Sequence, residues 1–226
     1  MKILLCLLAV LPALRQVDYA RFELDSLPQA VLTRYRNDNF LQRLDVVSGV
    51  AQASTRSLNF LQLDLNFRVA FVPGAGIDPA VRRMADQFLE SSLTLKQYLM
   101  RVRDYLHSNI RYSAAAGDQS PAAVLKRGSA DCVGLTRLVS GWLDAVGVSH
   151  REISGFYFRR DDAGLWQPQP HRWLEIRLPD GFAFFFDPQH RMFSPHYLVV
   201  RPGVDFRRVR RFRVLRIDSQ TRFENG

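Results

Sequence analysis

The sequence predicts an α+β fold in which helices come first and an antiparallel meander of strands follows. Apolar residues recur at helical spacing in three segments between residues 78 and 147. Three strand-like runs come next, at 150–158, 171–178 and 182–187. Helices followed by strands, without regular alternation of the two, favour an α+β arrangement over a parallel sheet.

The first twenty residues have the layout of a secretory signal. Lys2 precedes twelve apolar residues, Ile3 to Leu14, and small residues occur around Ala13 and Ala20. The apolar run is too short to span a hydrocarbon core of about 30 Å at about 1.5 Å per residue. We therefore expect residues 1–20 to be a signal for export to the periplasm or medium, or else an uncleaved N-terminal anchor.

Residues 21–77 form an extension that precedes the first clear helix. The segment 27–47, with scattered Leu and Phe among polar residues, predicts one or two short helices. Residues 59–72 alternate apolar and polar side chains and end at Pro73-Gly74, which predicts a strand. The pattern leaves open whether this extension inhibits, recognises a substrate or only packs.

Two half-buried helices open the domain that we assign to residues 78–200. Asp78 is an N-cap with Pro79 at the first helical position, and Thr94 forms a capping box with Gln97. The apolar stripes of the two helices are Val81, Met84, Ala85, Phe88 and Leu89, and Leu95, Tyr98, Leu99, Val102, Tyr105 and Leu106.

A third helix begins at or next to Cys132 and ends before Gly147, with apolar residues at positions 135, 138, 139, 142, 143 and 146. The N-H groups of a first turn and the positive end of the helix dipole favour a thiolate, so a cysteine here suits nucleophilic chemistry. Asp131 could instead be the N-cap, and its charge would oppose part of this effect. Removal of a signal would leave Cys132 as the single cysteine of an exported chain, either used or buried as a small core residue.

The last two strand-like runs are joined by Pro179-Asp180-Gly181, which predicts a three-residue hairpin loop. This register places Trp173 opposite Asp187. His171 and Asp187 would then share one face as diagonal neighbours, about 7 to 8 Å apart between backbones, a gap that an imidazole and a carboxylate can close. A two-residue loop would place them on opposite faces.

Cys132, His171 and Asp187 are the candidate catalytic residues. A thiol nucleophile needs a base within about 2.6 to 3.2 Å and a third group that orients the base. Each of the three residues, taken alone, is more often structural. Their occurrence together, on a helix, a strand and the adjacent strand, favours the catalytic interpretation.

The segments "GSADCVGLTRLVSGWLDAVGVSHREISG", "HRWLEI" and "FFFDP" resemble the transglutaminase-like (papain-like) superfamily over roughly residues 78–190. The resemblance implies a nucleophile helix packed on an antiparallel sheet, with Cys132 as nucleophile, His171 as general base and then acid, and Asp187 as orienting carboxylate. The chain departs from the family pattern at Ala130-Asp131 and at Arg172. These departures bear on the shape of the cleft more than on the three candidate residues.

The function that this implies is acyl transfer through a thioester, without a cofactor, in an exported cysteine hydrolase that cleaves amide or peptide bonds of a protein or peptide substrate. Two alternatives remain: a cross-linking acyltransferase that uses a lysine amine, and a non-catalytic binding module on the same fold. The scarcity of lysine, three residues in the chain, would limit self-modification but also follows from its arginine bias.

Further site residues are expected around the cysteine. The Cys132 backbone N-H is a natural oxyanion donor, with Tyr112 or Asn109 as candidates for the second donor, although packing at a helix end explains both as well. Trp166, in the loop before His171, could form a wall of the cleft. No metal site is expected, because the spacing of His171, Asp187, His190 and His196 matches no zinc motif.

Residues 201–226 are expected to be a basic C-terminal tail. They contain eight arginines and three acidic residues, in a chain of net charge +9. Such a tail is usually a solvated surface, and it would also favour an acidic partner or an anionic membrane surface. Nucleic acid is not an expected partner, since the sequence contains no recognisable nucleic-acid-binding motif.

Overall fold

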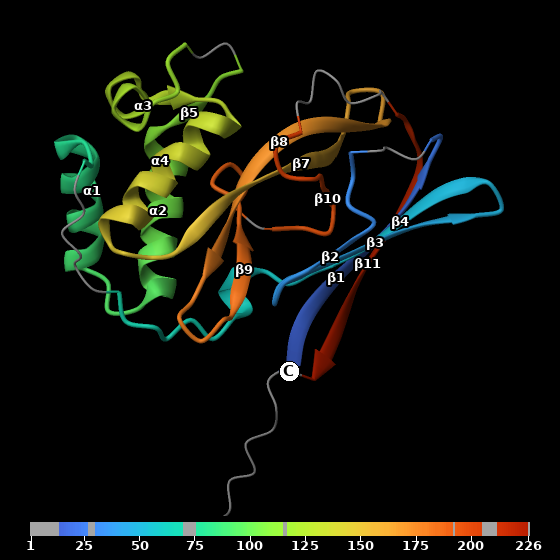
Figure 1. Cartoon of the computed structure of the whole chain (residues 1–226), viewed down its shortest axis with the longest axis horizontal. Coiled ribbons are helices and arrows are strands. Elements are labelled where there is room, and N and C mark those ends of the chain that lie inside the picture. Colours follow the sequence, from blue (N-terminus) through green and yellow to red (C-terminus); the bar gives the residue numbers. More distant parts are fainter. Residues whose placement is uncertain are drawn as a thin grey trace, which may run out of the picture.

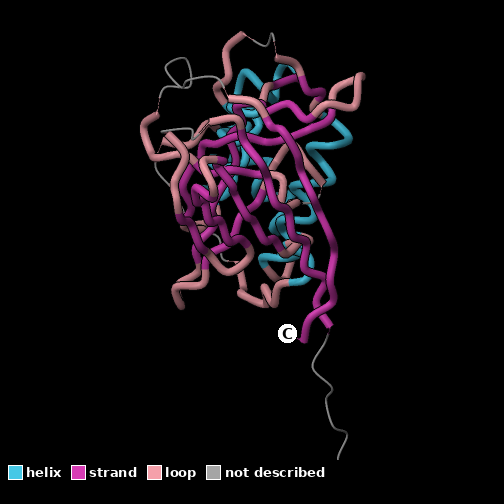
Figure 2. The backbone as a smooth tube through the Cα atoms, turned by 90° about the vertical axis from the view of Figure 1, so that its right-hand side faces the viewer, coloured by secondary structure: helices cyan, strands magenta, loops and turns pink. Residues whose placement is uncertain are grey.

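The structure is a computed structural model that describes residues 14–26, 30–69, 76–114, 117–191, 193–204 and 212–225. Helices gather on one side of the molecule, and two antiparallel sheets form the rest (Figure 1). Figure 2 shows the strands layered in front of the helices. The α+β prediction is confirmed. The α-helices of the described residues are α1 (Pro79–Glu90), α2 (Leu95–Asn109), α3 (Pro121–Arg127) and α4 (Cys132–Ala145).

The three predicted helices begin where their capping residues indicate. The Asp78 side chain accepts hydrogen bonds from the backbone of the first turn of α1, and Pro79 is the first helical residue. Thr94 and Gln97 form the reciprocal capping box of α2. Gly147, with φ of 66°, follows α4 in the left-handed conformation that a helix C-terminus favours. Helix α3 and the short parallel pair β5 (Arg111–Tyr112) and β6 (Ser129–Ala130) were not predicted.

A four-stranded antiparallel sheet carries the predicted meander, in the order β10-β7-β8-β9. In the loop between β8 and β9 the Leu178 N-H donates to the Phe182 carbonyl, and Gly181 has a positive φ of 89°. Arg177 pairs with Ala183, which is the predicted three-residue hairpin register. The strands are β7 (His150–Arg160), β8 (Trp166–Arg177), β9 (Ala183–Phe186) and β10 (Tyr197–Val199).

A five-stranded sheet, in the order β11-β1-β4-β3-β2, replaces the predicted helical extension. The prediction of short helices within 27–47 is wrong, because burial along β3 alternates with a period of two, which is the pattern of a half-buried strand. The predicted strand at 59–72 is also wrong over its described part, 59–69, which holds one 3-10 turn, η1 (Phe60–Gln62), and no strand. The strands are β1 (Leu14–Leu24), β2 (Arg34–Arg36), β3 (Phe40–Val47), β4 (Val50–Ser57) and β11 (Val214–Asn225).

Both ends of the described chain meet in this sheet, since β1 pairs with β11 along its whole length. Residues 14–20 were expected to belong to a signal, but they form the first part of β1. A boundary at residue 20 would therefore divide a strand. Residues 1–13 lie outside the described part of the chain. The expected tail, 201–226, contains β11. Its arginines at 213 and 216 pair with Asp25 and Asp218. Among the described residues no helix is long and apolar enough to cross a membrane.

Polar side chains connect the two sheets. Asn39 bonds both the N-H and the carbonyl of Phe185 in β9, as a neighbouring strand would. Glu175 of β8, which is 1% exposed, accepts a hydrogen bond from Tyr35 of β2. The Arg151 and Arg177 guanidinium groups each lie 2.8 Å from the same carboxylate. The N-terminal sheet therefore braces the strands that carry the candidate residues.

Glu175→Gln is expected to lower the free energy of unfolding at neutral pH by about 2 kcal/mol, because it removes a buried charge bonded to half-exposed arginines. Burial opposes ionisation of Glu175, but the bonds from Tyr35, Arg177 and Arg151 hold its pKa below the ordinary value. Its contribution is therefore present above the unfolded pKa and is lost as the pH falls through the lower folded pKa. Urea unfolding across this pH range should show that the difference in the free energy of unfolding between wild type and variant becomes smaller in acid. A difference that does not depend on pH would contradict this account.

Candidate active site

Cys132 is the first residue of α4, and its half-buried thiol is the one free cysteine among the described residues. Asp131 is the N-cap: its side chain accepts a hydrogen bond from the Gly134 N-H at 2.9 Å. The alternative in which Asp131 caps the helix is therefore the correct one. The Cys132 N-H lies in the first turn, where backbone donors have no partner within the helix. This position places the sulfur and a backbone donor together at the positive end of the helix dipole.

Gln119, which the sequence analysis missed, covers the start of the same helix. Its Oε1 accepts a hydrogen bond from the Asp131 N-H at 3.3 Å. A Cβ added at Gly134 would lie 2.0 Å from that oxygen, so only glycine leaves room for this amide. No spacing rule connects a glutamine in a loop with a helix start twelve residues later, and the contact exists only because α3 folds back against α4.

His171 and Asp187 meet as the hairpin register predicted. His171 Nε2 lies 2.7 Å from Asp187 Oδ2, and both residues are buried, 5% and 3% exposed. The predicted diagonal therefore closes into a direct hydrogen bond. A bond at this nitrogen leaves Nδ1 as the ring atom available to a nucleophile.

His171 also lies close to the thiol. Burial alone would lower the pKa of His171, but the Asp187 charge, the hydrogen bond with Asp187 and the interaction with Cys132 together raise that pKa to about 10. An imidazole beside a thiol at a helix N-terminus is the arrangement of an activated nucleophile. The structure thus places Cys132, His171 and Asp187 near one another, on α4, on β8 and directly after β9.

Asp187 lies in a closed environment of donors that the sequence did not reveal. Its Oδ1 accepts the Gln189 N-H at 2.8 Å and the His190 N-H at 3.4 Å, and its Oδ2 accepts the Tyr197 hydroxyl at 2.5 Å. Burial would raise the pKa of this carboxyl, but His171, then His190 and the Tyr197 bond, lower it to about 2. The carboxylate therefore stays charged although water does not reach it.

The remaining candidates are placed less favourably. Tyr112 is 49% exposed. Two effects raise the pKa of Tyr112: first its partial burial, and then the charge of the nearby Cys132. The Asn109 amide instead donates to the Tyr105 carbonyl at 2.9 Å, which is the helix-end packing given as its alternative. Trp166 does not stand in a loop before His171. It begins β8, and its ring packs on His196 and under Arg160, about 16 Å along the strand from His171 at about 3.3 Å per residue.

Donor atoms that could hold a metal ion do occur together here. Ligand atoms of His171, Asp187 and His190 lie within 4.8 Å of one another, which the spacing of these residues in the sequence did not indicate. The His190 ring packs at a tilt on the Tyr157 ring, with centroids 4.3 Å apart, and its Nε2 is buried without a hydrogen-bond partner among the described residues. The nitrogen and oxygen nearest each other in this group, His171 Nε2 and Asp187 Oδ2, are already bonded together, so the arrangement needs no metal to hold it.

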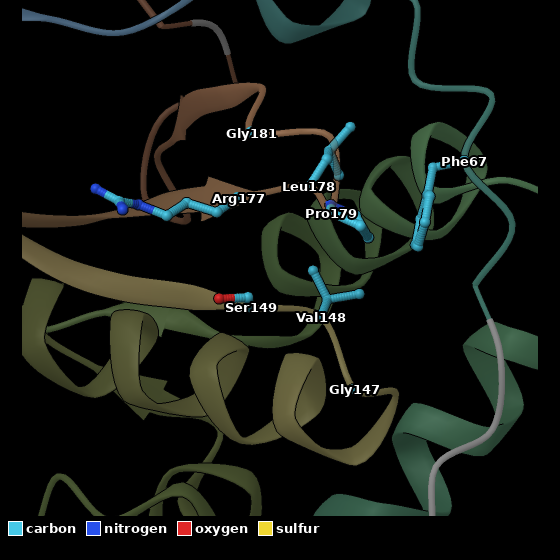
Figure 3. Close-up of a pocket in the computed structure, with 8 residues that line it drawn as sticks. All are labelled: Phe67, Gly147, Val148, Ser149, Arg177, Leu178, Pro179 and Gly181. Atoms are coloured by element: carbon cyan, nitrogen blue, oxygen red, sulfur yellow. The ribbon is translucent and has the colours of Figure 1, made fainter.

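A separate pocket of about 390 Å³ lies at the opposite end of α4, lined by Phe67, Gly147, Val148, Ser149, Arg177, Leu178, Pro179 and Gly181 (Figure 3). Gly147 follows the C-terminus of the helix, whereas Cys132 begins it. A 14-residue helix is about 21 Å long at about 1.5 Å per residue. This pocket is therefore remote from the thiol.

Comparisons with known proteins indicate which family and fold the chain resembles. Residues 82–188 match the family model described as the transglutaminase-like superfamily. The fold is similar to that of a candidate cysteine protease from Cytophaga hutchinsonii, with a TM-score of 0.50 and 10% identity, over 95% of this chain and 92% of that one. The periplasmic domain of TgpA from Pseudomonas aeruginosa bound to ethylmercury matches with a TM-score of 0.44 and 18% identity, over 79% of this chain and 75% of that one. No curated protein sequence matches the chain.

Proposed function

Since residues 82–188 form a transglutaminase-like superfamily domain, we propose that this protein is an exported cysteine hydrolase that cleaves amide or peptide bonds with Cys132, His171 and Asp187. The observation that carries the proposal is the bond of His171 Nε2 to Asp187 at 2.7 Å, on a ring close enough to Cys132 for the thiol to help raise the pKa of His171. Export is included on the strength of the N-terminal sequence.

In the first half of the reaction the Cys132 sulfur attacks the carbonyl carbon of the amide. The negative charge that develops on the carbonyl oxygen is stabilised by the backbone N-H of Cys132. The C-N bond then breaks, the imidazolium of His171 gives its proton to the departing amine, and a thioester remains on Cys132. Asp187 keeps the ring oriented throughout.

In the second half, water attacks the thioester. His171, now neutral, takes a proton from the water as it adds, and the C-S bond breaks to release the carboxylic acid. The thiolate and imidazolium are regenerated. If an amine replaces the water at this step, the same residues transfer the acyl group and form a new amide, which is the cross-linking alternative.

The substrate is proposed to be a protein or peptide. A partner for the basic C-terminal region is a weaker proposal, because the described arginines at 213 and 216 already pair within the chain. The role of the 21–77 segment is proposed to be support of β8 and β9, through the contacts of Asn39 and Tyr35.

The test is alkylation of Cys132 by iodoacetamide between about pH 6 and pH 7, compared with a small model thiol of pKa about 8.5. We expect the protein thiol to react at least about tenfold faster, because an adjacent imidazole activates a thiol nucleophile. A rate no faster than that of the model thiol would contradict the enzyme proposal and favour a binding module. Incubation with a glutamine-bearing peptide, with and without added amine, then separates hydrolysis, which yields free acids, from amine incorporation.

A further inference from the structure

Four donors of the described residues bond the Asp187 carboxylate, two to each oxygen. The two oxygens differ in the kind of donor that they accept. Oδ1 takes two backbone N-H groups of the loop after β9, those of Gln189 and His190. Oδ2 takes two side chains, His171 Nε2 at 2.7 Å and the Tyr197 hydroxyl at 2.5 Å. The oxygen that orients the imidazole is therefore shared with a tyrosine.

Tyr197 is itself fixed in place. It is fully buried, its ring stacks on Phe193 at 4.3 Å, and it meets the Trp173 ring edge to face at 5.1 Å. It belongs to β10 and pairs with Tyr157 of β7. Because the ring is held by these neighbours, its hydroxyl oxygen stays within hydrogen-bond distance of Asp187 Oδ2.

The protonation state of Tyr197 does not vary under ordinary conditions. Burial, and then the Asp187 charge, raise the pKa of Tyr197 well above its usual value. The hydroxyl therefore keeps its proton at neutral pH. A permanent donor on Oδ2 helps to keep a carboxylate ionised when it is shielded from water.

We propose that Tyr197 is a positioning residue of the active site, whose hydroxyl fixes the Asp187 oxygen that orients His171. The inference rests on the proposed function for its effect on catalysis, but the contact itself can be tested separately. Without the hydroxyl, Asp187 Oδ2 would keep one donor in place of two, and the carboxylate could turn about the Oδ1 contacts. The His171 ring would then sample orientations in which Nδ1 no longer faces the thiol.

The chain offers a matched control in Tyr157. The ring centroids of Tyr157 and Tyr197 both lie 6.0 Å from that of His171. Of the two tyrosines, only Tyr197 donates a hydrogen bond to Asp187 among the described residues. Tyr197→Phe and Tyr157→Phe therefore remove the same atom at the same ring distance from His171, and they differ in the hydrogen bond to the carboxylate.

We expect Tyr197→Phe to slow alkylation of Cys132 by iodoacetamide about tenfold, which is at the lower end of what one hydrogen bond to a charged group contributes, and Tyr157→Phe to change it less than about twofold. In a His171→Ala background the Tyr197 substitution should have no further effect, since it acts through that ring. Equal rates for the two Phe variants would overturn the inference, as would the same slowing by Tyr197→Phe in the His171→Ala background.

A second readout does not depend on thiol chemistry. In Cys132→Ala protein labelled with ¹⁵N-histidine, the Nε2-H proton signal of His171 reports its bond to Asp187. We expect Tyr197→Phe to shift or broaden this signal and Tyr157→Phe to leave it unchanged. An unchanged signal in both variants would overturn the assignment of Tyr197. An unreactive wild-type thiol together with a shifted signal would instead count against the proposed hydrolase and support the Tyr197 contact.

Discussion

Replacing His171 with alanine is expected to slow alkylation of Cys132 by iodoacetamide at about pH 6.5 by up to roughly 100-fold. A model thiol of pKa about 8.5 is only about 1% thiolate at that pH, so activation of a thiol by an adjacent imidazole can speed its alkylation by up to about 100-fold. Loss of the general base should reduce turnover of an amide substrate further, by about 10²- to 10⁴-fold. The measurement is the second-order alkylation rate, followed by mass spectrometry of the labelled protein.

The control for this substitution is His196→Gln. His196 is a half-buried histidine that packs on Phe22 and Trp166, away from the thiol. We expect the His196 variant to keep the wild-type alkylation rate. His171→Gln, which preserves more of the side-chain volume, should behave as His171→Ala does. Unchanged alkylation in both His171 variants would show that the imidazole does not activate Cys132.

Gly155→Ala is expected to lower the free energy of unfolding by about 3 kcal/mol or more, because the added methyl group has no space. A Cβ at this position would lie 2.1 Å from the Leu198 carbonyl oxygen and 2.5 Å from the Trp173 ring. The first obstacle is backbone, so β10 would have to move away from β7. That movement would also displace Tyr197, and we expect slower alkylation of Cys132 in the fraction that folds. Urea unfolding and the alkylation rate measure the two effects.

Gly117→Ala is the matched control for this prediction. Gly117 also has an ordinary φ, but a Cβ there would meet nothing within 4 Å. We expect its free energy of unfolding to stay within about 0.5 kcal/mol of wild type. Gly155→Ala with near wild-type stability would mean that β7 and β10 separate more easily than their close approach indicates.

The helices and the meander followed from local signals in the sequence. Capping residues such as Asp78 and Thr94 act within one helical turn, and the turn after Leu178 fixes a register through its own geometry. Such signals are readable because the atoms involved are near neighbours along the chain. The hairpin register in turn predicted that His171 and Asp187 share a face, so two of the three candidate residues were related before the fold was known.

The N-terminal sheet could not be predicted in the same way. The strand β3 alternates buried and exposed residues, but one of its buried positions is the polar Gln42, which bonds the Leu32 and Val199 carbonyls. A search for alternating apolar residues does not identify a polar residue such as Gln42 as buried. Likewise, β1 and β11 are neighbours although they lie at opposite ends of the described chain, and their pairing depends on where the intervening chain leads them.

By itself, the sequence determined the α+β class, the start of a helix at or next to Cys132 and the shared face of His171 and Asp187, because each depends on interactions between residues close together in the chain. Only the tertiary structure decided that the His171 ring lies close to the thiol, that Tyr197 shares the Asp187 oxygen and that Trp166 lies far from both. Those contacts join side chains from separate elements, and their distances are set by how the sheets pack against α4 and against each other.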